Sequence, residues 1–154
     1  NSHFDHIGTT ARAESAKLLV AKVREIAGGK PAFCTGDFNS NQNTEAYKTI
    51  AGSGILADSY VRCPSKTNGD WPTYNGYKYI STPPAAASRI DHVFVSPEFN
   101  VDRYGMLTNM YWTDDAQTDA QNSNQAPSEL EFRKMTLRTP SDHYPVFVRI
   151  NYKK

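Results

Sequence analysis

Apolar and polar residues follow two different periods along this chain, and each period predicts one kind of element. Between residues 11 and 27, apolar side chains recur at spacings of three and four, which predicts a helix with one apolar stripe. Thr9 or Thr10 is suited to cap its start, and Gly28 and Gly29 are suited to end it. We therefore expect one long helix near the beginning of the chain.

A shorter helix is predicted further along, from Asn43 or Thr44 to about Ala51, before Gly52. Short runs of apolar and β-branched residues predict strands at 31–38, 89–96, 101–107, 132–138 and 144–152. The order of strand, helix, strand, helix and then several strands predicts a layered α/β (α+β) domain with a mixed sheet.

Two segments have the composition of loops. Residues 58–88 interleave Pro and Gly with Trp and Tyr, and residues 113–129 are dominated by Asp, Gln, Asn, Ser and Thr. Small polar residues and turn formers favour irregular backbone, so 113–129 is the best candidate for a long surface insertion.

Composition and charge narrow the class of protein. With 154 residues and 38% hydrophobic content, the chain can build the core of one domain, and no apolar run approaches the roughly 20 residues that span a bilayer. A net charge of +1 gives no basic surplus for gripping long nucleic acid. The chain begins at Asn1 inside a motif, without Met or a signal-type segment, so we expect a fragment or a processed chain of unknown location.

The two cysteines are too few for a disulfide framework or a zinc finger. Cys34 is expected to be a buried strand thiol, and Cys63 a free thiol in a loop. A bridge between them stays open.

Four acidic motifs lie beside predicted strands, and each joins an Asp to a His or an Asn. They are NSHFDH at 1–6, TGDFNS at 35–40, SRIDHVFVS at 88–96 and PSDHYPV at 140–146. Carboxylate, amide and imidazole groups gathered at strand ends can hold a hard divalent cation and a phosphate together. The motifs therefore predict metal-assisted hydrolysis of a phosphoester.

The TGDFNS motif places Asp37 and Asn39 two positions apart, on one side of an extended backbone. In that geometry Asp37 can bind a metal or orient and deprotonate a water, and Asn39 can bind a metal or a phosphate oxygen. The alternative is a turn in which the Asp side chain caps its own backbone.

The remaining motifs offer histidines beside carboxylates. A carboxylate at Asp142 favours the protonated form of His143, which can neutralise charge on a phosphate. Asp91 lies in an apolar strand and therefore needs a partner. We expect His3 to be that partner, with a salt bridge to Arg89 or Arg103 as the alternative.

Alternation along the strands places the other residues of these motifs, and two further histidines are expected to be structural. Alternation along a strand puts His3 and Asp5 on one face and Phe4 in the core. His6 is expected to stabilise a loop, and His92 to point away from Asp91.

Together, the four motifs closely resemble the C-terminal half of the endonuclease/exonuclease/phosphatase superfamily, which includes exonuclease III-like nucleases, DNase I and neutral sphingomyelinases. The resemblance covers essentially the whole chain, and GDFN is its most diagnostic part. It implies a phosphoester substrate (nucleic acid, nucleotide or phospholipid headgroup) and Mg²⁺ or Mn²⁺ as cofactor, with water as the nucleophile.

The resemblance also implies roles at matching positions. His3 would contact the scissile phosphate, Asp37 would activate water, Asn39 would hold phosphate or metal, and Asp91 would orient His3 or His143. His143 would stabilise the pentacovalent phosphate. The metal ligands would be Asp37, Asn39, Asp142 and His143.

The fold implied is half of a four-layer α/β/β/α sandwich with a mixed, largely antiparallel sheet. Residues 1–154 would form the C-terminal portion of one domain, because the family's N-terminal Asn and metal-binding Glu have no counterpart here. We expect the chain to pair with the missing half or to self-associate, and to be poorly active alone.

Substrate contacts are expected from an aromatic loop and from the long helix. Trp71, Tyr74 and Tyr77 either stack on a base or sugar or cover the rim of the core. The resemblance makes Tyr74 and Asn75 candidate substrate contacts, and Arg12 another, with a solvated helix face as its alternative.

Two rival functions stay open. A zinc hydrolase is suggested by His3, Asp5 and His6, but Asn1 stands where that signature needs a further His. A non-catalytic phosphoester-binding member of the same fold is the other rival.

Overall fold

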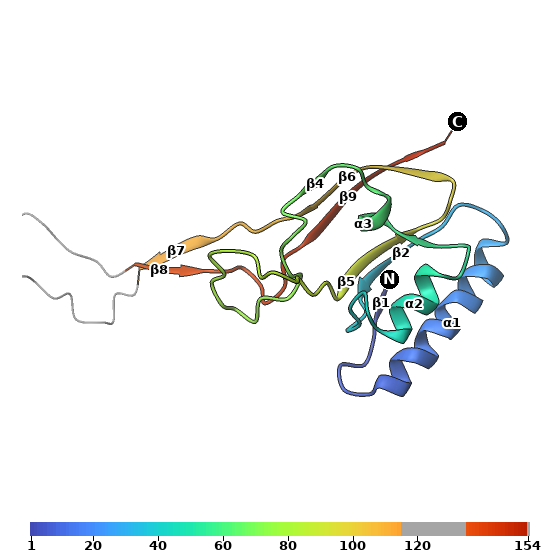
Figure 1. The fold of residues 1–154 in the computed structure, drawn as a ribbon, viewed down its shortest axis with the longest axis horizontal. Helices are drawn as coiled ribbons and strands as arrows, with labels where there is room; N and C mark the ends of the chain where they lie inside the picture. The colour runs from blue at the N-terminus through green and yellow to red at the C-terminus, as the bar shows by residue number, and fades with distance from the viewer. Residues whose placement is uncertain (115–134, 154) are drawn as a thin grey trace, which may run out of the picture.

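The computed structural model describes residues 1–114 and 135–153 (Figure 1). Its helices are α1 (Thr9–Ala27), α2 (Glu45–Ala51) and α3 (Ser59–Arg62). The strands are β1 (Ser2–His3), β2 (Phe33–Asp37), β3 (Ala57–Asp58), β4 (Lys66–Thr67), β5 (Asp91–Val95), β6 (Phe99–Met106), β7 (Tyr111–Asp114), β8 (Met135–Arg138) and β9 (Val146–Tyr152).

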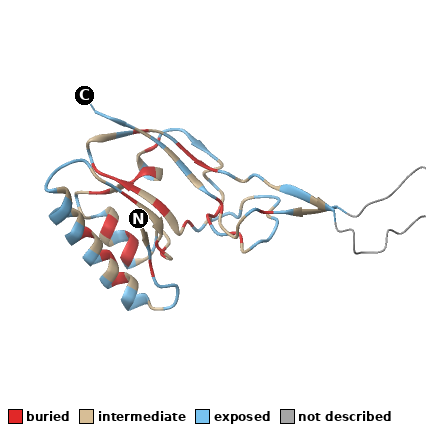
Figure 2. Ribbon diagram, turned by 180° about the vertical axis from the view of Figure 1, so that it is seen from behind, coloured by how far each residue is buried: buried red, intermediate tan, exposed pale blue. Residues whose placement is uncertain are grey.

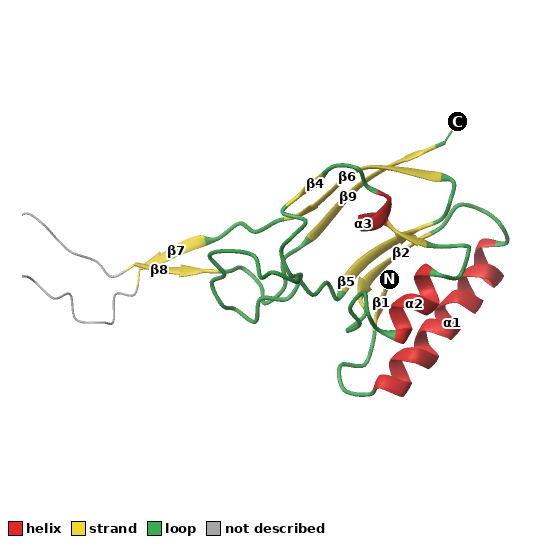
Figure 3. Ribbon diagram, in the orientation of Figure 1, coloured by secondary structure: helices red, strands yellow, loops and turns green. Residues whose placement is uncertain are grey.

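These strands form two sheets and one hairpin (Figure 3). The first sheet has the order β1-β2-β5-β3, in which β1 and β2 are parallel and the other pairs antiparallel. The second has the order β4-β6-β9, with a long antiparallel β6–β9 pair. Strands β7 and β8 pair with each other and project from the body (Figure 1).

Two apolar cores separate three layers (Figure 2). Helices α1 and α2 cover one face of the first sheet through a core that includes Phe38, Ile50 and Phe94. The second core includes Val95 and Tyr104 and joins the two sheets. Because successive strand residues point to opposite faces, β5 contributes to both cores. The helix, sheet, sheet order agrees with the predicted partial sandwich.

The long helix differs from its prediction only at its start. It begins at Thr9, and its N-cap is Gly8, without a side-chain cap hydrogen bond, so Thr9 and Thr10 do not cap it. Instead, the carboxylate of Asp5 accepts hydrogen bonds from the N–H groups of Ile7 and Gly8. At the other end, Gly28 adopts the left-handed conformation, as expected for a terminating glycine.

Most other elements follow the predicted pattern. Thr44 caps α2 by accepting a hydrogen bond from the N–H of Tyr47. The expected strand at 132–138 is observed from Met135, and most of the insertion predicted at 113–129 lies outside the described residues. The expected loop at 58–88 also contains the short elements α3 and β4.

Both cysteines are free and buried, so Cys63 is a free thiol in the loop after α3, as expected, and no bridge joins it to Cys34. Within residues 1–114 and 135–153, no helix has the length and apolar character needed to cross a membrane.

Candidate active site

Sheet pairing brings three of the four motifs side by side. In the parallel pair, His3 of β1 is the partner of Asp37 at the end of β2. In the antiparallel pair, Asp37 is also the partner of Asp91 at the start of β5. The fourth motif joins them through the segment before β9, so the same edge of the first sheet carries residues from all four motifs.

His143 connects the acidic side chains at this edge. Its Nδ1 lies 2.8 Å from Oδ2 of Asp91, and its Nε2 lies 3.9 Å from Oδ2 of Asp37. The same Asp37 oxygen is 3.4 Å from Nε2 of His3. Asp37, Asp91 and His143 keep 19%, 21% and 26% of their side-chain surface exposed, so the cluster is open to a ligand.

The partner of Asp91 is therefore His143, and the prediction of His3 was wrong. Arg89, one of the two alternative partners, is instead bound to Asp58 at 2.8 Å. His3 pairs with Asp37 because β1 lies beside β2, whereas β5 lies on the other side of β2. Strand order, which the sequence does not display, decides these pairings.

The environment of His143 favours its protonated form. Burial alone would lower the pKa of His143, but the hydrogen bond and charge of Asp91, together with the charges of Asp37 and Asp142, raise it above its ordinary value. An imidazolium held by the carboxylate of Asp91, with Nε2 3.9 Å from Asp37, is suited to stabilising negative charge on phosphate.

Asn39 does not continue the strand as predicted. Its φ of 45° lies in the left-handed region, and its N–H donates to Oδ1 of Asp37 at 2.8 Å. Its side-chain amide donates to the carbonyl of Phe4 at 2.9 Å. The expected alternative, a turn capped by its own Asp, thus forms, and it leaves Oδ2 of Asp37 facing the two histidines.

Asp142 and Asn75 stand beside the cluster rather than in it. The carbonyl of Asp142 accepts hydrogen bonds from the N–H groups of Asn75 and Gly76. Its carboxylate accepts a long bond of 3.4 Å from the hydroxyl of Ser141. Asn75 is only 5% exposed, and its amide binds the carbonyl of Ser141, so its contacts hold the loop in place.

The other predicted substrate residues are more exposed than Asn75. Tyr74 is 52% exposed, and its ring meets that of His143 edge-on, with 5.1 Å between centroids. Tyr77 is also exposed, whereas Trp71 packs against Tyr144 at the rim of the second core. Arg12 donates one hydrogen bond to the carbonyl of Asp5, at 3.1 Å.

Thr73 contributes to the site and was missed in the sequence. It is fully buried, and its hydroxyl accepts hydrogen bonds from the N–H groups of Ile90 and Asp91. Its carbonyl accepts another from the N–H of Tyr144. Thr73 thereby ties the start of β5 to the segment of His143, and no sequence pattern distinguishes it from an ordinary loop threonine.

The donor set fits a hard divalent cation in part. Asp37, Asp91 and His143 each offer one ligand atom, and these atoms lie within 4.8 Å of one another. Carboxylate oxygens suit Mg²⁺ or Mn²⁺, but such ions prefer about six ligands. Because Asp91 and His143 already bind each other, Asp37 is the best candidate ligand of this cluster.

Comparison with known proteins shows the family of this chain. The model of the Endonuclease/Exonuclease/phosphatase family matches residues 1–143. The chain belongs to this family.

Solved structures of similar proteins are about twice as long. A mannosyl-6-phosphatase from Bacteroides thetaiotaomicron is 37% identical, with a TM-score of 0.76, over 97% of this chain and 49% of its own. A family protein from Bacteroides vulgatus is 29% identical, with a TM-score of 0.67, over 98% and 48%. The chain thus spans about half the length of these proteins.

More distant likeness concerns the fold alone. A Staphylococcus aureus beta toxin whose structure contains bound magnesium ions is 18% identical, with a TM-score of 0.54, over 95% of this chain and 46% of its own. No curated protein sequence matches the chain.

Proposed function

We propose that this chain supplies the catalytic Asp/His half of a divalent-metal-dependent phosphoester hydrolase. The observation that carries the proposal is the Asp91–His143–Asp37 arrangement, in which one imidazole joins two carboxylates and stays partly exposed. Such a group is placed to meet a phosphate at the sheet edge.

In the proposed reaction, a water oxygen attacks phosphorus while the ester P–O bond breaks, and the leaving alkoxide takes a proton from solvent to become an alcohol. Asp37 orients the water and accepts its proton. His143, kept protonated by Asp91, donates a hydrogen bond from Nε2 to a phosphate oxygen as negative charge builds up. His3 stands on the other side of Asp37 and contacts the same phosphate.

Mg²⁺ or Mn²⁺ would be held by Asp37, with Asn39 and Asp142 as further candidate ligands. When bound, such a cation would neutralise phosphate charge and help to polarise the nucleophile. Asp142 would need to turn its carboxylate toward the cluster, since it now contacts Ser141.

The remaining ligands would come from an N-terminal half. Because the chain spans about half of its structural relatives, we propose that a second half completes the domain, supplied by the same polypeptide or by a separate one. Self-association is the alternative.

A sugar phosphate is the first substrate to test, because a relative 37% identical to this chain is a mannosyl-6-phosphatase. Tyr74 and Arg12 are the proposed substrate contacts, and Asn75 acts by holding the loop that carries Tyr74. Nucleic acid, nucleotide and phospholipid headgroup esters belong in the same panel.

The test compares hydrolysis of aryl phosphate mono- and diesters by the domain completed with its N-terminal half. Activity should require Mg²⁺ or Mn²⁺, disappear with a chelator and be absent from an Asp37→Ala variant that folds normally. This chain alone should be poorly active. Tight ester binding without turnover in the completed domain would favour the non-catalytic rival instead.

A further inference from the structure

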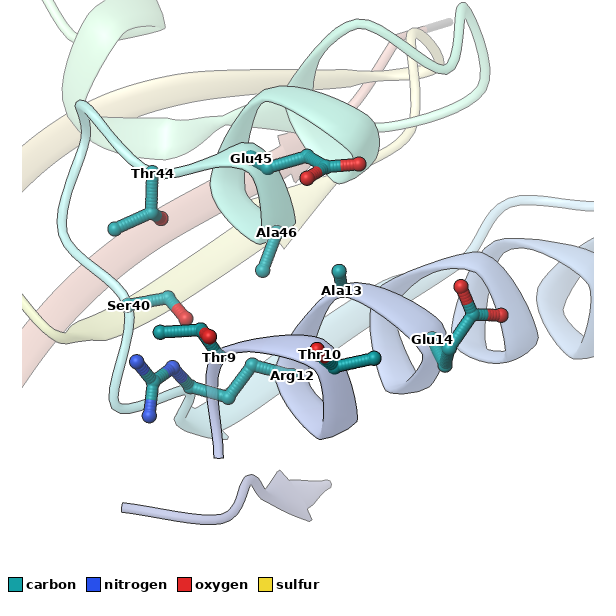
Figure 4. Close-up of a pocket in the computed structure, with 9 residues that line it drawn as sticks. All are labelled: Thr9, Thr10, Arg12, Ala13, Glu14, Ser40, Thr44, Glu45 and Ala46. Atoms are coloured by element: carbon teal, nitrogen blue, oxygen red, sulfur yellow. The ribbon is translucent and has the colours of Figure 1, made fainter. Parts of the chain in front are cut away.

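A hollow lies between the starts of α1 and α2 (Figure 4). Its volume is about 390 Å³, within the range of small-molecule sites. The loop that follows β2 forms part of its wall through Ser40, three residues after Asp37. Because α1 follows β1 and α2 follows β2, the hollow opens at the same edge of the sheet as the catalytic cluster.

Ser40 indicates that the hollow takes a ligand. Its residue surface is 1% exposed, and its hydroxyl has no hydrogen-bond partner among the described residues. Figure 4 shows this hydroxyl pointing toward the space between the two helices. A buried hydroxyl without a partner is unfavourable, so such groups usually bind something.

The two ends of the hollow differ in charge. Arg12 lies at the end near Ser40 and Thr9, and within the described chain it uses one guanidinium N–H, toward the carbonyl of Asp5. Glu14 and Glu45 lie at the opposite end, where Glu14 is also paired with Lys17 at 2.8 Å. Hydrogen-bond donors therefore line one side and carboxylate acceptors line the other.

The charge difference between the two ends limits which kinds of ligand can bind in the hollow. A free anion would meet two carboxylates, a free cation would meet the guanidinium, and an apolar molecule would leave Ser40 without a partner. A neutral polyol satisfies both ends, because each hydroxyl both donates and accepts hydrogen bonds.

We propose that this hollow is a sugar-binding subsite, which takes a carbohydrate ring belonging to the substrate beside the scissile phosphate. Arg12 and Ser40 bind hydroxyl oxygens, and Glu14 and Glu45 accept from hydroxyl groups at the other end. The role in catalysis rests on the proposed function, whereas the binding of a sugar does not.

The test is an NMR titration of the completed domain with methyl α-mannoside, which carries no phosphate. Saturable shifts are expected at the amides of Ser40 and Glu45. Ser40→Ala and Glu45→Gln should each weaken binding about tenfold, as the loss of one hydrogen bond predicts. Lys22→Gln, on an exposed part of α1 away from the lining residues, is the matched control and should bind normally.

The inference is overturned if no saturable shift appears, if both variants bind like the parent, or if inorganic phosphate shifts these amides more strongly than the sugar does. Ester hydrolysis is measured separately with an aryl phosphate. Loss of sugar binding with intact hydrolysis counts against the subsite alone, and sugar binding without hydrolysis counts against the proposed function alone.

Discussion

Two polar clusters flank the start of β5, and they contain similar residues but have different roles. In one, Asp91 holds His143 beside Asp37 in a partly exposed group. In the other, Asp58 binds Arg89 and the hydroxyl of Tyr47, each at 2.8 Å. The side chains of Asp58 and Arg89 are 1% and 5% exposed.

The histidines of the two clusters show the difference most clearly. Burial lowers the pKa of His92 and outweighs the nearby charge of Asp58, so this imidazole is kept neutral beside its carbonyl partner on Ser40. The pKa of His143 is raised instead, because the hydrogen bond and charge of Asp91 outweigh its smaller burial.

The two clusters thus differ in burial and in how fully the oxygens of their carboxylates are hydrogen-bonded, and this difference separates a structural cluster from a reactive one. Asp58 has its oxygens occupied by Tyr47, Arg89 and the N–H of Tyr60, and no side is left for a ligand. In the Asp37–His143 cluster, by contrast, the side chains of Asp37, Asp91 and His143 all stay partly exposed. Substitutions in the first should affect stability, and those in the second should affect activity.

The largest effect is expected from Asp37→Asn. Removing the proposed base should lower kcat of the completed domain by about 10²–10⁴-fold, with the melting temperature nearly unchanged. Steady-state hydrolysis of an aryl phosphate and thermal unfolding measure the two. Unchanged kcat would remove Asp37 from the reaction.

Arg89→Met should give the opposite result. It leaves the buried carboxylate of Asp58 without its cation, which typically destabilises a protein by about 3–5 kcal/mol. Denaturant unfolding measures this loss, and activity per folded molecule should hold. Lys17→Gln, at an exposed pair with Glu14, is the control and should change little. A loss of kcat in folded Arg89→Met would contradict the purely structural role of the Asp58–Arg89 cluster.

Thr73→Val should have a moderate effect on both properties. The change keeps the shape but removes the acceptor of two buried N–H groups, at a cost of about 1–3 kcal/mol. Activity should fall because Asp91 and His143 lose a shared anchor, and Thr73→Ser should retain most of it. Equal behaviour of the two variants would assign Thr73 a packing role only.

Asp91→Asn should produce the smallest change in the fold but a clear shift in pH dependence. Since the pKa of His143 is raised in the folded chain, its protonated form stabilises the fold below the unfolded pKa, and that contribution is lost as pH rises through the folded value. In Asp91→Asn the pKa of His143 should fall, and the alkaline limb of activity should move to lower pH. NMR titration of His143 and a pH–rate profile measure both, and an unmoved pKa would contradict the pairing.

The sequence was sufficient to predict the main elements and the meeting of the motifs. The stripe at 11–27 and the GDFN turn beside a strand depend on local patterns, which survive folding. It was not sufficient for the partner of Asp91 or the roles of Thr73 and Arg89. These depend on strand order and on contacts between distant segments, which a single sequence does not display.

The most direct test of the account is a crystal structure of the completed domain with Mn²⁺ and phosphate. The account predicts an anomalous manganese signal beside the carboxylate of Asp37 and a phosphate oxygen within hydrogen-bond distance of Nε2 of His143. Manganese and phosphate bound elsewhere, with Nε2 of His143 left facing solvent, would contradict it.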